Sequence, residues 1–90
     1  MVNAAGVDAD RVHALLEPVT WRTQPSRGEY YLLDKTEGGR VGRVIFQCPG
    51  PEGKGVLVAP TVHGNLIVGP NAAPVTDRRD LGNTADGLAF

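Results

Sequence analysis

The polar residues of this 90-residue chain suggest two kinds of chemistry by their type and spacing. Arg27 lies shortly before the phenols of Tyr30 and Tyr31. A guanidinium beside an apolar strand can hold an anionic substrate by paired hydrogen bonds, although an ordinary strand with charges at its edge is the simpler interpretation. Residues 77–80, Asp-Arg-Arg-Asp, form a charge cluster, which we interpret as a solvated loop with local ion pairs of little energetic value.

Three further motifs are weaker candidates for a functional site. The loop 50–55 has the Gly-Lys pair of a phosphate-binding loop, but Cys48 and Gly55 occupy the places where that motif needs a glycine and a hydroxyl residue. His13 is expected on a helix and His63 beside a hairpin turn, with no carboxylate at ligand spacing, so we predict no metal site. No cationic neighbour activates Cys48 as a nucleophile, and we expect a buried or half-buried structural cysteine.

Composition restricts the class of protein. The formal net charge is -1 with both signs interspersed, which disfavours binding to nucleic acid or to an anionic membrane surface. A single cysteine cannot form an internal disulfide, so we expect a reducing cytoplasm. We expect no transmembrane segment, because no apolar run approaches about 18 residues, and no signal peptide.

The 12 glycines and 7 prolines predict many turns and short strands, and the apolar runs between them predict an α+β fold. A helix over residues 8–17 is expected, with Asp8 as N-cap and Pro18 as its stop. The step Gly64–Asn65 predicts a tight hairpin, and residues 71–83 are expected to be irregular. We expect the helix to pack beside a small antiparallel sheet, with strands near 28–35, 42–48, 55–61 and 66–69.

Both ends of the sequence indicate a piece of a larger protein. Asn83 or Thr84 can cap a second helix, of which residues 85–90 are only the beginning. At the other end, small apolar residues lead directly into the first helix. We therefore expect an internal fragment.

Three segments resemble, in order and spacing, the FAD-dependent oxidoreductases of the D-amino-acid oxidase superfamily, in particular the glycerol-3-phosphate dehydrogenase-like members. Residues 3–6, Asn-Ala-Ala-Gly, are similar to a segment that ends a strand of the FAD domain in that family. Residues 25–35 read Pro-Ser-Arg-Gly-Glu-Tyr-Tyr-Leu-Leu-Asp-Lys, and residues 53–70 read Gly-Lys-Gly-Val-Leu-Val-Ala-Pro-Thr-Val-His-Gly-Asn-Leu-Ile-Val-Gly-Pro. Both are similar to motifs of the family's substrate domain, although Ser26 replaces a basic residue there.

The resemblance implies a domain organisation and a set of site residues. Residues 1–18 would be the end of an FAD-domain strand with a helix, residues 19–83 the substrate-domain sheet, and residues 84–90 the start of a truncated helix. The family pattern carried over residue by residue implies Ala5 and Gly6 near the cofactor and Arg27, Tyr31 and Thr61 at the substrate. It assigns no catalytic residue.

The implied function is that of a substrate-domain fragment of an FAD-dependent dehydrogenase acting on glycerol 3-phosphate or a similar small hydroxylated substrate. The family's glycine-rich turn, whose helix N-terminus holds the FAD pyrophosphate, is absent from this sequence. We therefore expect FAD as cofactor of the parent protein but no binding of FAD and no turnover by these residues alone. The expected partners are the remainder of the parent chain and a small-molecule substrate.

Two alternatives remain open. The parent could be a 2-hydroxy-acid or amino-acid oxidase, which uses the same flavin chemistry with oxygen as the acceptor. Alternatively, the chain could be a free-standing binding or assembly module derived from such an enzyme. That alternative includes self-association through exposed sheet edges, because an uncovered edge strand offers unpaired backbone groups.

Overall fold

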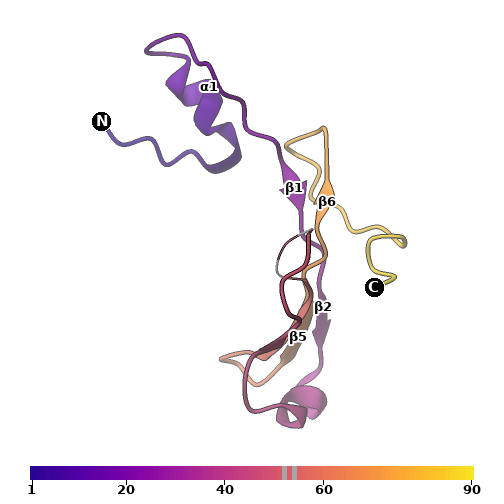
Figure 1. Cartoon of the computed structure of the whole chain (residues 1–90). Helices are drawn as coiled ribbons and strands as arrows, with labels where there is room; N and C mark the ends of the chain where they lie inside the picture. Colours follow the sequence, from indigo (N-terminus) through magenta and orange to yellow (C-terminus); the bar gives the residue numbers. More distant parts are fainter. Residues whose placement is uncertain (52, 54) are drawn as a thin grey trace.

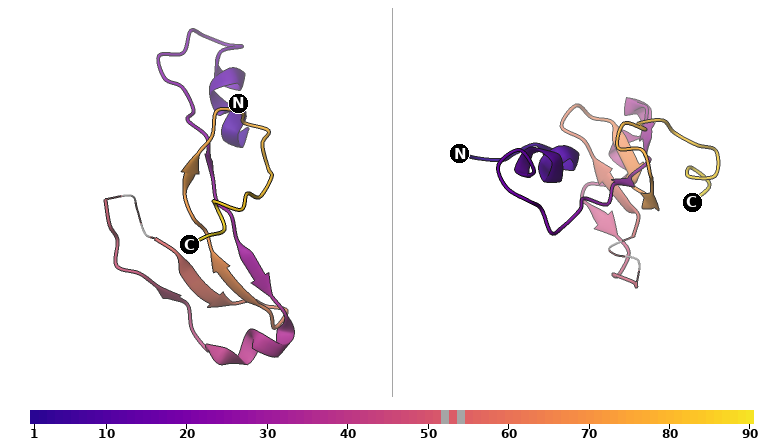
Figure 2. Two further views of the ribbon diagram at one scale, coloured as in Figure 1. Left: turned by 90° about the vertical axis from the view of Figure 1, so that its right-hand side faces the viewer. Right: turned by 90° about the horizontal axis from the view of Figure 1, so that it is seen from above.

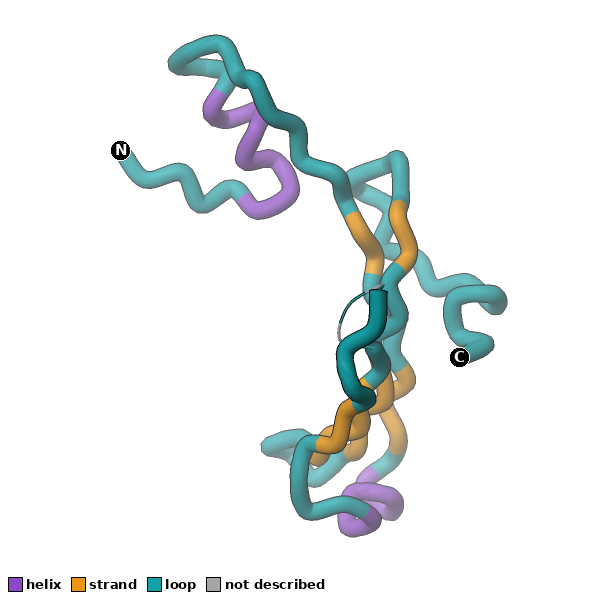
Figure 3. The backbone as a smooth tube through the Cα atoms, viewed as in Figure 1, coloured by secondary structure: helices purple, strands orange, loops and turns teal. Residues whose placement is uncertain are grey.

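The computed structural model describes residues 1–51, 53 and 55–90 and shows an elongated molecule with much of its chain in loops (Figures 1 and 3). Its radius of gyration is 16.7 Å and its extents are 51 × 29 × 25 Å. A compact domain of this length would have a radius of gyration of about 12 Å. Among the described residues, Ala59 and Leu66 are the buried apolar side chains. The chain therefore encloses little apolar core of its own.

A four-stranded antiparallel sheet forms one end of the molecule (Figure 1). Its order is β2-β5-β4-β3, so the strand that comes first in sequence pairs with the one that comes last. This arrangement confirms the α+β fold class, and each strand lies within or at a range predicted from the sequence. The four strands are β2 (Tyr31–Leu33), β3 (Ile45–Phe46), β4 (Leu57–Pro60) and β5 (Leu66–Gly69).

Both faces of this sheet are apolar. Residues paired across antiparallel strands share a face, and successive residues alternate between faces. One face therefore carries the row Tyr31, Val68, Val58 and Ile45, and the other carries the row Leu32, Ile67 and Ala59. An apolar pattern on both faces is typical of a sheet that is covered on both sides.

The predicted hairpin joins β4 to β5. The backbone N–H of Thr61 donates to the carbonyl of Asn65 at 2.9 Å, and Gly64 takes a positive φ of 87° in the turn. The Asn65 side-chain amide donates to the Leu33 carbonyl at 3.1 Å, which attaches the turn to β2. The hairpin is thus fixed to the strand that begins the sheet.

A second, two-stranded sheet lies next to the first and was missed in the sequence. It pairs β1 (Ser26–Arg27) with β6 (Ala73–Pro74), so the expectation of an irregular segment over 71–83 is wrong at these two residues. Pro74 has no N–H to donate, which argued against a strand there, but an edge position opposite Ser26 does not require that donor.

The N-terminal helix is shorter than predicted. A 3-10 turn, η1 (Gly6–Asp8), precedes α1 (Ala9–His13), and hydrogen-bonded turns continue to Glu17. Asp8 is the N-cap residue, but its side chain makes no capping hydrogen bond. Its φ and ψ of −100° and 11° continue the 3-10 turn and do not give the extended backbone that a capping carboxylate requires.

The helix also lies elsewhere than expected. Figure 1 places α1 at the end of the molecule opposite the four-stranded sheet, and Figure 2 shows the same separation from the side. Residues 18–25 form an extended connector between them and keep the helix away from the sheet, so the expected packing beside it is wrong. In the part of the chain that the structure describes, no helix is long and apolar enough to cross a membrane.

The segment between β2 and β3 forms the 3-10 helix η2 (Lys35–Arg40). The Asp34 carboxylate accepts from the N–H of Thr36 at 3.0 Å, and this hydrogen bond lowers the pKa of Asp34. At Gly38 a Cβ would collide with the Gly64 carbonyl oxygen. The close approach of η2 to the hairpin turn therefore requires a glycine at this position.

We expect Gly38→Ala to lower the free energy of unfolding by about 2 kcal/mol, because the Gly64 backbone must move to admit the methyl group. Gly39→Ala is the matched control, since a Cβ there meets nothing within 4 Å. Urea denaturation followed by circular dichroism would measure both variants. Equal midpoints for the two variants would contradict the close packing of η2 on the hairpin.

Candidate functional site

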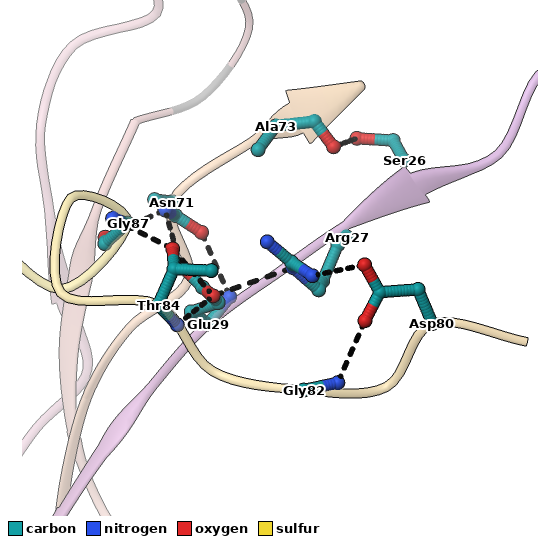
Figure 4. A network of polar contacts seen from close by, with 9 residues as sticks. All are labelled: Ser26, Arg27, Glu29, Asn71, Ala73, Asp80, Gly82, Thr84 and Gly87. Atoms are coloured by element: carbon teal, nitrogen blue, oxygen red, sulfur yellow. Dashed lines mark hydrogen bonds and ion pairs between the residues drawn. The ribbon is translucent and has the colours of Figure 1, made fainter. Parts of the chain in front are cut away.

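A buried carboxylate lies where the two sheets meet. The Glu29 side chain has no solvent-exposed surface, and one glycine, Gly28, separates it from β1. Its two oxygens accept hydrogen bonds from the backbone N–H of Thr84 at 2.6 Å, from the Thr84 hydroxyl at 3.1 Å and from the Asn71 side-chain amide at 3.2 Å (Figure 4). Burial of a carboxylate is tolerated when its lone pairs are met in this way. Glu29 therefore holds the C-terminal segment, residues 84–90, against the sheets.

Three glycines make room for this arrangement. A Cβ on Gly87 would collide with the Glu29 carboxylate, and one on Gly28 would lie 2.7 Å from Cβ of Pro70. Gly69 has a φ of 137°, and a Cβ there would lie 2.9 Å from the Glu29 carbonyl oxygen. At Gly69 and Gly87 the backbone therefore lies too close to Glu29 for any residue that carries a Cβ atom.

Arg27, expected at the substrate, is engaged with two carboxylates. Its Nη1 lies 2.7 Å from Oδ2 of Asp80, and its Nε lies 3.3 Å from Oε1 of Glu29 (Figure 4). The Nε atom is buried without a well-directed hydrogen bond. A substrate anion that binds Arg27 would therefore compete with the half-exposed Asp80 for the guanidinium.

The structure brings Tyr31 close to this network but not Thr61. The Tyr31 hydroxyl donates to the Leu88 carbonyl at 2.7 Å, and its ring meets the edge of Phe90 at a centroid distance of 5.7 Å. Arg27 and Tyr31 thus both border the segment that includes residues 80–90. Thr61 lies in the hairpin turn, where its Oγ1 accepts from the N–H of Asn65 at 3.1 Å.

Ala5 and Gly6, expected near the cofactor, belong to the N-terminal unit, which comprises residues 1–24. Gly6 takes a positive φ of 57°, and a Cβ placed on it would meet nothing within 4 Å. The Asn3 side chain accepts from the Ala5 N–H at 3.3 Å and donates to the Ala9 carbonyl at 2.8 Å, which fixes this turn. The backbone at Gly6 is therefore ordered and open on one side.

An ion pair between Asp10 and Arg78 was missed in the sequence. Arg78 Nη2 donates to Oδ2 of Asp10 at 2.6 Å, its Nη1 donates to Oδ1, and both side chains are nearly buried. The interpretation of residues 77–80 as a solvated loop with local ion pairs is therefore wrong at Arg78, while Asp77, Arg79 and Asp80 are exposed. The sequence gives no local signal for it, because the partners are 68 residues apart.

The protonation of this pair is strongly biased toward the charged forms. The hydrogen bonds from Arg78 lower the pKa of Asp10 far below its usual value of 3.8, against the opposing effect of burial. The backbone N–H groups of Thr23 and Arg11 lower it further. The Asp10 carboxylate in turn raises the pKa of Arg78.

The other candidates contribute less. Cys48 is exposed and follows the edge strand β3, so the expectation of a buried or half-buried cysteine is wrong. A cavity of about 570 Å³ lies beside it, between this edge and Pro70. The His13 ring lies tilted against the Trp21 ring at a centroid distance of 5.7 Å, and within the described residues no group of three or more potential ligands gathers for a metal ion. Residues 52 and 54 of the rejected phosphate loop lie outside the described residues.

Comparison with known proteins finds similar enzymes. The whole chain is similar to a segment of an enzyme named glycerol 3-phosphate dehydrogenase, and most of it is similar to segments of two enzymes named glycerol 3-phosphate oxidase. The dehydrogenase of Caloramator mitchellensis is 51% identical over 90 residues, which are 100% of this chain and 19% of the relative. The oxidases of Mycoplasma genitalium and Mycoplasma pneumoniae are 33% and 31% identical, over 80% and 87% of this chain and 19% and 20% of their own lengths.

The chain thus spans about a fifth of the length of the curated relatives it matches. No family model matches it. No solved structure matches it either.

We expect Glu29→Gln to release residues 84–90 and to lower the free energy of unfolding by about 3 kcal/mol, because the amide replaces one accepting oxygen by an NH2 group that only donates and leaves Arg27 Nε without a carboxylate. Hydrogen exchange of the Thr84 and Leu88 amides, followed by NMR, would measure the release. Glu37→Gln, at an exposed ion pair on η2, is the control. Unchanged protection of Thr84 in Glu29→Gln would contradict the anchoring role of Glu29.

The lowered pKa of Asp10 predicts acid sensitivity of the N-terminal unit. A carboxyl group whose pKa is lower in the folded chain stabilises it fully above the unfolded value of 3.8, and this contribution is lost progressively as the pH falls below that value. The Thr23 amide chemical shift should therefore stay constant from neutral pH down to about pH 4 and change at lower pH. In Asp10→Asn this transition should be missing, and a transition that persists would contradict the assignment.

Proposed function

We propose that residues 1–90 form the substrate-domain sheet, with a short cofactor-facing segment, of an FAD-dependent enzyme that oxidises glycerol 3-phosphate. The observation that carries the proposal is 51% identity over the entire chain to an enzyme named glycerol 3-phosphate dehydrogenase. The elongated shape and the two apolar faces of the four-stranded sheet support it, since such a sheet is stable when other layers cover it. The single cysteine supports a reducing cytoplasm as its compartment.

In this proposal residues 1–18 belong to the cofactor side, residues 19–83 to the substrate side, and residues 84–90 begin a helix. The open backbone at Gly6 fits a close approach of a flat ring system to Ala5 and Gly6. Bound FAD would supply the hydride acceptor. The chain has no glycine-rich turn to hold the FAD pyrophosphate, so we expect no stoichiometric FAD binding by residues 1–90 alone.

The substrate side has named candidates. Arg27 is the cation for the phosphate group, because its guanidinium pairs with the half-exposed Asp80, with which a substrate phosphate would compete. Tyr31 borders the same region with its hydroxyl directed at the Leu88 carbonyl. Thr61 is the third candidate for substrate binding and lies in the hairpin turn, outside the network of Arg27 and Tyr31.

A second candidate is an oxidase of the same substrate, with oxygen as the electron acceptor. The two Mycoplasma relatives are named glycerol 3-phosphate oxidase, which favours this alternative. Measuring hydrogen peroxide against reduction of an artificial quinone would separate the two acceptors.

A chimera tests the proposal. Residues 1–90 would replace the matching fifth of the Caloramator mitchellensis dehydrogenase. We expect the chimera to retain FAD and to oxidise glycerol 3-phosphate. A folded chimera that binds FAD but leaves glycerol 3-phosphate unchanged would refute the proposed substrate.

Within that chimera, Arg27→Ala should raise KM for glycerol 3-phosphate by roughly tenfold or more, since one charge-assisted hydrogen bond is lost. Arg22→Ala, which removes an exposed arginine of the connector, is the matched control and should leave KM unchanged. FAD content measured by absorbance shows that each variant is folded. Equal KM values in the two variants would remove Arg27 from the substrate site.

A further inference from the structure

The N-terminal unit, residues 1–24, is attached to the rest of the chain by one side chain. Among the described residues, every hydrogen bond and ion pair that joins residues 1–24 to residues 25–90 comes from Arg78. The large apolar side chains Val7 and Trp21 of this unit are each 46% exposed. The placement of this unit relative to the sheets therefore depends on Arg78.

Arg78 reaches both ends of the unit. Its Nη1 donates to the Val7 carbonyl at 2.7 Å, next to the open turn at Gly6. The Asp10 carboxylate that it binds also accepts from the Thr23 N–H at 3.0 Å, near the end of the unit. The guanidinium thus gathers the beginning of the unit and its exit around one buried charge.

The other side of the attachment is anchored in the sheets. Arg78 lies in a turn in which the Asp77 carboxylate accepts from the Arg79 N–H at 2.9 Å and the Asp77 carbonyl accepts from the Asp80 N–H at 3.2 Å. Asp80 then pairs with Arg27 of β1 at 2.7 Å. An alternating series of charges, Asp10, Arg78, Asp80, Arg27 and Glu29, thereby runs from the helix to the junction of the sheets.

We propose that Arg78 is a positioning residue that sets the distance and orientation between the Ala5–Gly6 segment and the sheets. Resting on the proposed function, this assignment means that Arg78 aligns the cofactor-facing backbone with the substrate-facing Arg27 and Tyr31, although it contacts neither ligand. A bidentate guanidinium is suited to this task because its planar donors fix direction as well as distance.

The test measures the distance directly in residues 1–90. Spin labels would be attached in a Cys48→Ser background at Leu15→Cys and Val62→Cys, which are 82% and 96% exposed and lie on the unit and on the hairpin. Pulsed electron paramagnetic resonance then gives the distribution of distances between them. We expect a single narrow distance distribution without a substitution at residue 78 and a distribution at least twice as broad in Arg78→Gln. The control Arg79→Gln, which replaces the adjacent exposed arginine, should leave the distribution unchanged.

Two further variants separate positioning from folding. Arg78→Lys should restore part of the narrow distribution, because an ammonium can still bind one Asp10 oxygen, and Asp10→Asn should broaden it as Arg78→Gln does. The amide chemical shifts of β4 and β5 report that the sheet is folded in each variant. A narrow, unshifted distribution in Arg78→Gln with a folded sheet would overturn the proposal.

The outcome does not depend on the proposed function, because neither cofactor nor substrate is present in the measurement. A chimera without activity would refute the proposed function and leave the role of Arg78 intact. Conversely, an unchanged distance distribution would refute the role of Arg78 and would not affect the proposed function, which the activity of the chimera tests.

Discussion

A carboxylate withdrawn from water must be met by donors, and Glu29 meets this requirement by drawing together parts of the chain that are far apart in sequence. Thr84 comes from the C-terminal segment, Asn71 from the exit of β5, and Arg27 from β1. Glycines at 28, 69 and 87 allow the backbone to close around it. The two sheets and the C-terminal segment therefore share one polar centre, in a chain whose apolar core is small.

Features that depend on interactions between residues close in sequence were predicted, and features that depend on residues far apart in sequence were not. The strands β2, β4 and β5 and the hairpin between the last two depend on local apolar runs and on a glycine turn, and all were predicted. The β1–β6 pair, the Glu29 network and the Asp10–Arg78 pair join residues between 42 and 68 positions apart. No local pattern encodes such pairs, and the helix 8–17 was overestimated because apolar spacing continues through residues that form only turns.

The same distinction applies to the candidate site. Arg27 and Tyr31 were singled out for their residue types, and the structure places both beside the C-terminal segment. The structure adds that Arg27 already has two carboxylate neighbours, which residue type alone could not indicate. Thr61 was named from a resemblance over residues 53–70, and its hydroxyl has a local partner in the hairpin turn.

The long separation between Asp10 and Arg78 also affects how the chain acquires its structure during synthesis. Residues 1–24 leave the ribosome long before Arg78 has been made, and they have no other polar attachment among the described residues. The buried carboxylate of Asp10 must therefore stay hydrated until the turn at 77–80 arrives. Within residues 1–90, the N-terminal unit is therefore translated before the turn that fixes its position.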